Sequence, residues 1–394
     1  MRVLISGAGV AGPTLAWWLL HHGFAPTLVE SAPRLRTGGY IIDFWGAGFE
    51  IARRMNLLPA LEPLGYRVEE MRVVDARSRK IAGLSTDAFF QLTRGGFISI
   101  PRGDLAACIY QALGGRVETL FGDRIVSLQS SKDGVSVEFE NAAPRTFDLV
   151  IGADGLHSGV RQLVFGDETH FEKYMGCKAA AFQLAGYAPR DELIYVMHTE
   201  VGQQVARFSM HDDRTMFLFT FRDRDPAIPA TLAGQKALLR QRFAGTGWEV
   251  PQILDALDGV SELYIDRVSQ IRMGNATHTW SRERVALVGD AAFCVSLLAG
   301  QGTALAMVAA YILAGELSRS PEDPTAAFAR YQQRFGPFVL GKQKSARGMV
   351  DFFAPRSPLA LALRNGALRL MRWPWLVNLA AGRSLLDRIE IPDY

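Results

Sequence analysis

The chain has 394 residues, a length that suits two domains of ordinary size. Hydrophobic residues make up 48% and charged residues 21% of the sequence, which is typical of a globular protein with a large buried core. The net charge of +3 is too small to indicate a nucleic-acid partner. No run of about 18 uncharged apolar residues occurs, so we expect no transmembrane segment.

Three cysteines, Cys108, Cys177 and Cys294, lie far apart in the chain. Their spacing fits no metal site, and an odd number leaves one without a disulfide partner. We therefore expect reduced cysteines, no bound metal and a cytoplasmic protein.

The N-terminal thirty residues carry the first recognisable motif. Residues 3–6 predict an apolar strand, and Gly7, Gly9 and Gly12 follow it with the spacing G-x-G-x-x-G. The stretch "PTLAWWLLHHGF" predicts a helix, and "PTLVE" predicts a second strand that ends at Glu30. Together these features form the βαβ unit that binds dinucleotides. In that unit the pyrophosphate lies at the helix N-terminus, and the acid accepts hydrogen bonds from a ribose.

The next part of the chain predicts further strands and helices. A helix and three strands are expected at 102–113, 117–121, 124–129 and 135–139. The stretch "FDLVIGADG" (147–155) predicts another apolar strand, and it ends in Asp154. A helix is expected over 158–165, and a cap on that helix is one possible role of Asp154.

Between residues 175 and 221 the pattern changes. Four strand-like stretches follow one another, at 177–185, 192–200, 203–211 and 215–221. No helical pattern alternates with them, so this segment predicts an antiparallel sheet in a layer of its own.

The last third of the chain returns to strands and helices joined by glycines. Residues 285–288 predict a strand that ends before Asp290, and Gly300 and Gly302 precede a long apolar helix. Two long helices are expected, over 303–318 and 325–345. The C-terminal residues predict amphipathic helices packed on the protein, with contact to a membrane surface as the alternative.

These patterns predict an α/β fold with an α+β insert. We expect a Rossmann-like nucleotide-binding domain at 1–174 and 266–350, interleaved with a substrate-binding sheet domain at 175–265. A C-terminal helical segment is expected at 351–394.

Four stretches, in this order, resemble the single-component flavoprotein monooxygenases of the para-hydroxybenzoate hydroxylase fold, which include the tetracycline-inactivating monooxygenases. They are "GAGVAG" with Glu30, "PRGDL", "GADGLHSGVR" and "VGDAAFCVSLLAGQG", and the resemblance spans about residues 1–345. It implies that the Rossmann-like domain binds FAD. It also implies a reduced nicotinamide, NADPH or NADH, that binds transiently without a Rossmann domain of its own.

The resemblance assigns roles to individual residues. The glycine motif and Glu30 hold the ADP half of FAD. Arg102 approaches the phosphates and the ribityl chain, and Asp154 serves the pyrophosphate region. Asp290 accepts a hydrogen bond from the ribityl chain.

Four more residues belong near the flavin ring by the same resemblance. Arg36 and Asp43 match a basic and an acidic position there. The turn from Gly300 to Gly302 directs a helix N-terminus at the pyrimidine edge of the flavin. Its positive dipole end would stabilise the reduced, anionic flavin by about 1–2 kcal/mol.

The implied activity is that of an oxidoreductase. With NAD(P)H and O2 it would hydroxylate an apolar, aromatic or polycyclic small molecule through a flavin hydroperoxide. No side chain is identified as a catalytic acid or base. We expect the sheet to bind the substrate through Arg207, Phe217 and Phe219. Because the two phenylalanines alternate and share a face, core packing is the alternative.

The sequence also departs from the family pattern. Phe293, Ser296 and Leu297 stand where the family has a histidine or tyrosine and prolines beside the flavin. Two alternatives therefore stay open, an FAD-dependent dehydrogenase or reductase and a non-catalytic flavin-binding redox protein.

Overall fold

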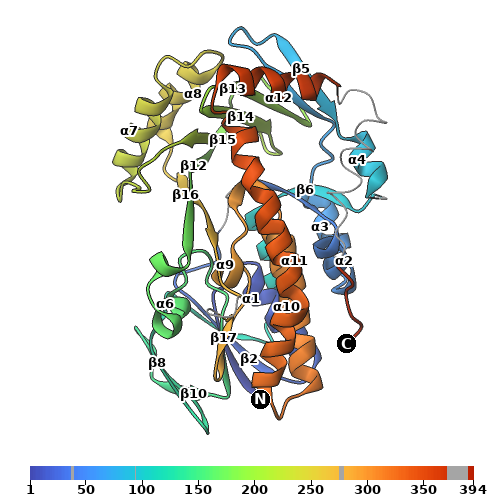
Figure 1. Ribbon diagram of the computed structural model, residues 1–394, viewed down its shortest axis with the longest axis vertical. Coiled ribbons are helices and arrows are strands. Elements are labelled where there is room, and N and C mark those ends of the chain that lie inside the picture. The colour runs from blue at the N-terminus through green and yellow to red at the C-terminus, as the bar shows by residue number, and fades with distance from the viewer. Residues whose placement is uncertain (37–39, 94, 275–278, 371–388) are drawn as a thin grey trace.

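The computed structural model describes residues 1–36, 40–93, 95–274, 279–370 and 389–394. The molecule is elongated, with a six-stranded sheet in its lower part and a seven-stranded sheet in its upper part (Figure 1). The long helix α11 (Pro324–Phe353) runs along both parts. The fold class predicted from the sequence is confirmed.

The lower sheet is mainly parallel. Across the sheet its strands are β17 (Ser281–Arg282), β18 (Val285–Leu287), β11 (Leu149–Gly152), β1 (Arg2–Ser6), β2 (Ala25–Glu30) and β7 (Glu118–Phe121). Only the β17–β18 pair is antiparallel. The central strands β1 and β11 are buried apart from Arg2, and their apolar runs at 3–5 and 149–151 suit strands that are covered on both faces.

Helices and small sheets surround this sheet. The helices are α1 (Ala11–His21), α2 (Ala47–Arg54), α3 (Leu58–Leu61), α5 (Arg102–Gln111), α6 (Gly159–Phe165), α9 (Asp290–Phe293) and α10 (Gly302–Arg319). The small antiparallel sheets are β3 (Ile41–Trp45) with β6 (Phe97–Pro101), and β8 (Ile125–Ser131) with β9 (Gly134–Phe139) and β10 (Arg145–Phe147). Short 3-10 turns occur at Glu62–Leu64, Glu168–His170, Leu257–Gly259 and Leu297–Ala299.

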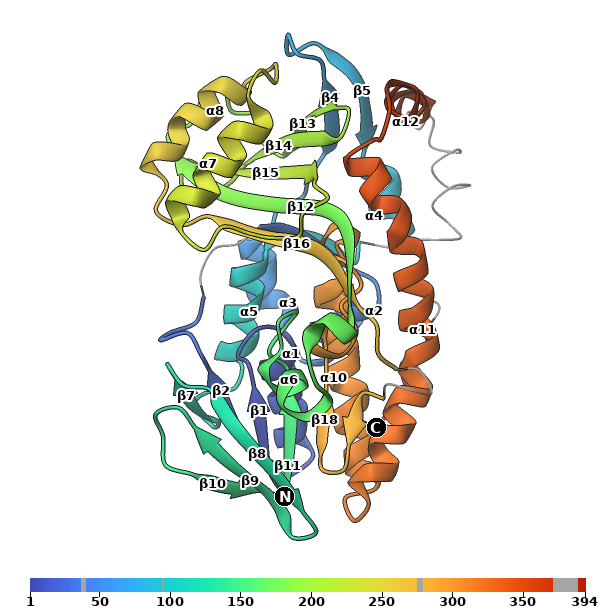
Figure 2. The same ribbon diagram turned by 60° about the vertical axis from the view of Figure 1, so that its left-hand side comes forward.

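The upper sheet is antiparallel except at one pair. Its strands in order are β16 (Tyr264–Ile271), β12 (Glu172–Ala185), β15 (Arg214–Arg222), β14 (Gln203–Ser209), β13 (Ile194–Glu200), β4 (Glu70–Val74) and β5 (Lys80–Ser85). Its helices are α4 (Asp87–Leu92), α7 (Leu232–Phe243), α8 (Val250–Ala256) and α12 (Pro358–Leu370). Helices α7 and α8 cover one face, which we call the outer face, and α12 lies on the opposite side (Figure 2).

The structure differs from the sequence-based expectation in three places. The hairpin β4–β5 lies within the predicted segment 1–174, but it extends the upper sheet. Strand β4 pairs in parallel with β13, so this sheet is not purely antiparallel. Strand β7, the first of the three strands expected between 117 and 139, does not join the sheet of the other two but pairs with β2 in the lower sheet. In each case the partner strand is distant in sequence.

The C-terminal segment is a helix only in part. Helix α12 matches the expectation, whereas residues 371–388 of the predicted segment lie outside the described residues. The last residues return to the lower part, where the hydroxyl of Tyr394 donates to Glu316 on α10 over 2.8 Å.

Candidate active site

The glycine motif forms the turn between β1 and α1. Gly7 has a φ of +105°, and a Cβ there would lie 2.6 Å from the carbonyl oxygen of Ala153. A Cβ on Gly12 would lie 1.9 Å from the Gly7 carbonyl oxygen. A Cβ on Gly9, in contrast, would meet no atom within 4 Å. Gly7 and Gly12 are therefore required by the fold, and Gly9 leaves room for a ligand.

Glu30 lies against this turn at the end of β2. Its Oε2 accepts a hydrogen bond from the backbone N–H of Ala8 at 2.8 Å, and its Oε1 accepts one from Ala32 at 2.9 Å. Arg36 is exposed, and its guanidinium lies 4.0 Å from the same carboxylate. The structure thus brings Glu30 and Arg36 together at the edge of the glycine motif.

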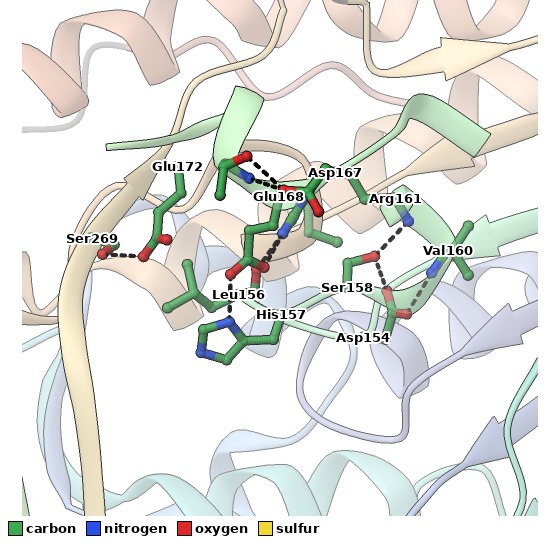
Figure 3. A network of polar contacts seen from close by, with 12 residues as sticks. Asp154, Leu156, His157, Ser158, Val160, Arg161, Asp167, Glu168, Glu172 and Ser269 are labelled. Carbon is green, nitrogen blue, oxygen red and sulfur yellow. Dashed lines mark hydrogen bonds and ion pairs between the residues drawn. The ribbon is translucent and has the colours of Figure 1, made fainter. Parts of the chain in front are cut away.

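Asp154 follows β11 and caps a helix (Figure 3). Its carboxylate accepts hydrogen bonds from the Ser158 hydroxyl at 2.5 Å and from the Val160 N–H at 3.1 Å. Ser158 in turn accepts the N–H of Arg161 at 2.9 Å. These contacts match the alternative interpretation of Asp154 as a cap of α6.

Asp290 follows β18, the neighbour of β11, and has a different environment. Burial raises the pKa of its carboxyl, and the positive charge of Arg102 opposes that rise. A Cβ on Gly302 would lie 3.5 Å from Asp290 Oδ1, so Asp290 sits at the start of α10. Arg102, exposed at the start of α5, also interacts electrostatically with Tyr40 and Tyr264.

The N-terminus of α10 has no capping side chain. Gly300 and Gln301, the two residues before α10, line a cavity together with Asp43 and Trp45 of β3. Asp43 Oδ1 accepts a hydrogen bond from the Ser99 hydroxyl at 2.6 Å, and burial raises its pKa. The free N–H groups of α10 and the side of β3 that carries Asp43 therefore face the same space.

The predicted substrate residues lie elsewhere. Phe217 and Phe219 are wholly buried on the outer face of the upper sheet, in a core with residues of α7 and α8. Arg207 is also buried and forms ion pairs with Asp191 at 2.7 Å and with Glu249 at 2.8 Å. Two carboxylates already compensate the charge of Arg207, and α7 and α8 cover the phenylalanines on the face that points away from β3. These positions fit the packing alternative and not the substrate-binding prediction.

The opposite face of the sheet, which we call the inner face, meets the candidate site. Met216 alternates with Phe217, and its Sδ accepts a hydrogen bond from the Ile41 N–H at 3.2 Å. Tyr195 interacts with Ser99 and with the charge of Asp43. The rings of Tyr264 and Tyr40 lie 5.6 Å apart. No motif in the sequence pointed to these residues, although strand alternation placed Met216 on the other face from the phenylalanine stripe.

The three residues that depart from the family pattern, Phe293, Ser296 and Leu297, lie in the segment between Asp290 and α10. Phe293 is buried and packs on Trp280 and Phe335, with ring centroids 5.0 and 5.4 Å away. Ser296 is buried with a φ of 153°, a value that proline cannot adopt. Leu297 packs against the apolar cluster between β12, β16 and α11.

The described part of the chain contains neither a candidate metal centre nor a candidate membrane span. No group of three or more His, Cys, Asp or Glu side chains there is arranged to hold a metal ion. No helix in the same residues combines the length and the apolar character needed to span a membrane.

Known proteins match the chain in sequence and in structure. The sequence model of the FAD binding domain family covers residues 1–323. The chain belongs to this family. It is 41% identical over 350 residues to an uncharacterized protein of Mycobacterium tuberculosis, with 86% of this chain and 91% of that protein covered. It is 32% identical over 403 residues to a flavin-dependent monooxygenase of Legionella longbeachae, with 100% and 98% covered.

The fold is also that of solved members of this group. The crystal structure of the tetracycline destructase Tet(55) matches with a TM-score of 0.83 at 31% identity, covering 100% of this chain and 98% of that one. The chain is therefore an FAD-dependent monooxygenase, an oxidoreductase with FAD as its cofactor. The alternatives of a dehydrogenase and of a non-catalytic redox protein are not supported.

The residues present fit FAD. Gly9 leaves open space at the start of α1, a helix without a capping side chain, which suits a pyrophosphate. At the other end of the site, the start of α10 also lacks a capping side chain and lies beside Asp290. The free N–H groups at the start of α1 suit the anionic pyrophosphate of FAD. Asp290 and the start of α10 suit its ribityl chain, which forms hydrogen bonds.

Proposed function

We propose that this monooxygenase hydroxylates an apolar, aromatic or polycyclic small molecule, with NADPH or NADH as a transient reductant. The observation that carries the proposal is the inner face of the upper sheet. Its residues Tyr195, Met216 and Tyr264 contact Ser99, Ile41 and Tyr40, which lie on or beside the β3–β6 pair that carries Asp43. Thioether and aromatic side chains suit a planar apolar substrate.

The cofactor residues proposed for this chain follow the geometry. Gly7, Gly9, Gly12 and Glu30 would hold the ADP half, with Arg36 at its edge. Arg102 and Asp290 would hold the middle of the cofactor. Asp43, Gly300 and Gly302 would face the flavin ring. When bound, FAD accepts electrons from the nicotinamide and activates O2.

The chain's own groups have distinct tasks around that chemistry. The start of α10 supplies fixed positive partial charge, which favours negative charge nearby. Burial raises the pKa of Asp43, and its carboxyl group accepts a hydrogen bond from Ser99, so its position beside Tyr195 is fixed. The apolar inner face orients the substrate and excludes water.

The nature of the substrate is further supported by the solved relative, whose name identifies it as a tetracycline destructase. We also propose a cytoplasmic location, because Cys108, Cys177 and Cys294 are all buried and free. NADPH is the reductant for which we would test first.

The test is a stopped-flow experiment with the FAD-loaded enzyme. Reduction of the flavin by NADPH or NADH is followed anaerobically, with and without a panel of planar phenols, naphthols and tetracyclines. The expected result is that at least one polycyclic compound accelerates reduction and is recovered with one added oxygen after admission of O2. Acceleration only by aliphatic compounds of the same size would contradict the proposed substrate class.

A further inference from the structure

Two buried glutamine side chains hold the segment between Asp290 and α10. Gln343 of α11 is 5% exposed and Gln270 of β16 is 0% exposed. Neither residue belongs to a motif that the sequence analysis identified. Both amides point at backbone carbonyl groups, and most of these belong to residues 293–295.

Gln343 contacts three carbonyl oxygens. Its Nε2 donates to Ile271 at 2.7 Å, to Cys294 at 3.2 Å and to Phe293 at 3.3 Å. Because all three neighbours are carbonyl oxygens, the amide nitrogen and not its oxygen must face them. One side chain thus joins β16 to the segment after Asp290.

Gln270 completes the arrangement from the side of the upper sheet. Its Nε2 donates to the carbonyl oxygen of Val295 at 2.9 Å and to that of Gln343 at 2.8 Å. The N–H of Ile271 donates to Cys294 at 3.0 Å. The two glutamines therefore bridge α11, β16 and residues 293–295, and we call this arrangement the glutamine clamp.

The clamp is needed because the segment cannot satisfy its own carbonyl groups. Helix α9 is only 4 residues long, and the 3-10 turn at Leu297–Ala299 begins after the clamped residues. A buried carbonyl without a donor is strongly unfavourable, so the donors fix where the segment lies. Both ends of this segment face the cofactor site, Asp290 at one end and Gly300 at the other.

We propose that Gln343 and Gln270 are positioning residues for the cofactor. They set the placement of Asp290 relative to the N-terminus of α10, and through it the affinity for FAD and the reduction potential of the bound flavin. They do this without touching the reacting atoms. This role goes beyond the proposed substrate class and does not depend on it.

The test compares Gln343→Met, which keeps the side-chain length but removes the donor, with Gln332→Met on the same helix. Gln332 also binds a distant backbone group, because its Oε1 accepts the N–H of Trp280 at 2.8 Å, but it does not contact the clamped segment. The apoproteins are titrated with FAD, the reduction potential of the bound flavin is measured, and unfolding is followed by urea.

We expect Gln343→Met to weaken FAD binding by about tenfold and to make the reduction potential of the flavin more negative. The reason is that Asp290 and the N-terminus of α10 would no longer be held in their positions relative to each other. Gln332→Met should lower the free energy of unfolding but leave the FAD affinity and the flavin potential unchanged. Gln270→Met removes one hydrogen bond to residues 293–295, whereas Gln343→Met removes two, so it should change both flavin properties in the same direction by less. It also tests the proposal if Gln343→Met does not fold. Unchanged FAD affinity and potential in the folded clamp variants, or equal changes in Gln332→Met, would overturn the proposal.

Discussion

The two faces of the upper sheet look alike in sequence but have different surroundings. The outer face carries Phe217, Phe219 and Phe221 and packs against α7 and α8 as a closed core. The inner face carries Tyr195 and Met216 and packs against β3, two residues from Asp43. The outer face, which is the more aromatic of the two, therefore stabilises the domain. The inner face, which is more mixed in composition, meets the cofactor site. Apolar character alone does not identify a substrate surface.

The largest effect should come from the outer face. Phe219→Ala removes a wholly buried ring and should lower the free energy of unfolding by about 3–5 kcal/mol. Urea denaturation measures this loss. The KM of the folded fraction for its substrate should stay the same. A KM that rises as stability falls would break the distinction between the two faces.

A smaller effect is expected below the inner face, at Asp290. Asp290→Ala removes an acceptor from the cofactor site and should weaken FAD binding by about 1–3 kcal/mol, as measured by titration of the apoprotein. Asp154→Ala is the matched control, because Asp154 caps α6. It should lower stability by about 1 kcal/mol and leave FAD affinity unchanged. An equal loss of FAD affinity in both variants would contradict this assignment.

The inner face itself is tested by Met216→Leu. The change keeps the volume but leaves the N–H of Ile41 without its sulfur acceptor. We expect the substrate KM to rise about fivefold, equivalent to about 1 kcal/mol. Phe217→Leu, one residue along the strand, should lower stability and leave KM unchanged. The reverse pattern would assign substrate binding to the outer face.

The smallest effect concerns the ion network where β16 meets α6 (Figure 3). Hydrogen bonds to Asp266 and Glu168 raise the pKa of His157 from 6.5 to about 9. A raised folded-state pKa stabilises the protein below pH 6.5, and this contribution is lost as the pH rises through about 9.

His157→Gln should therefore flatten the pH dependence of stability between pH 6.5 and 9. The side chain is 47% exposed, so solvent screening limits the change to about 1 kcal/mol or less. Thermal unfolding at several pH values measures it. The same slope in variant and wild type would show that His157 does not carry the pH dependence.

The elements predicted well are those whose signals are local. The turn at Gly7, the strand ending in Glu30 and the helix after Gly302 each follow from neighbouring residues, and the structure contains all three. The pairing of β4 with β13 joins strands more than a hundred residues apart, and no local pattern specifies it. Alternation showed that Phe217 and Phe219 share a face, but the cover of that face comes from α7 and α8.

The candidate site shows the same limit. Asp154 and Asp290 both follow buried parallel strands, and their local sequences predict a similar role. Only the structure shows that Ser158 and Val160 bind the first, while the second lies beside Arg102 and α10. The family pattern has prolines in the loop that contains Ser296. The φ of 153° at Ser296 excludes a proline at this position.

Monooxygenase chemistry at the inner face is tested most directly by turnover in isotopically labelled dioxygen with a polycyclic aromatic substrate that accelerates NADPH oxidation. We expect the product to carry one labelled oxygen atom, and we expect Met216→Leu to lower its yield more than Phe217→Leu does. Product whose new oxygen comes from water, or equal turnover without O2 in the presence of an artificial electron acceptor, would contradict this expectation.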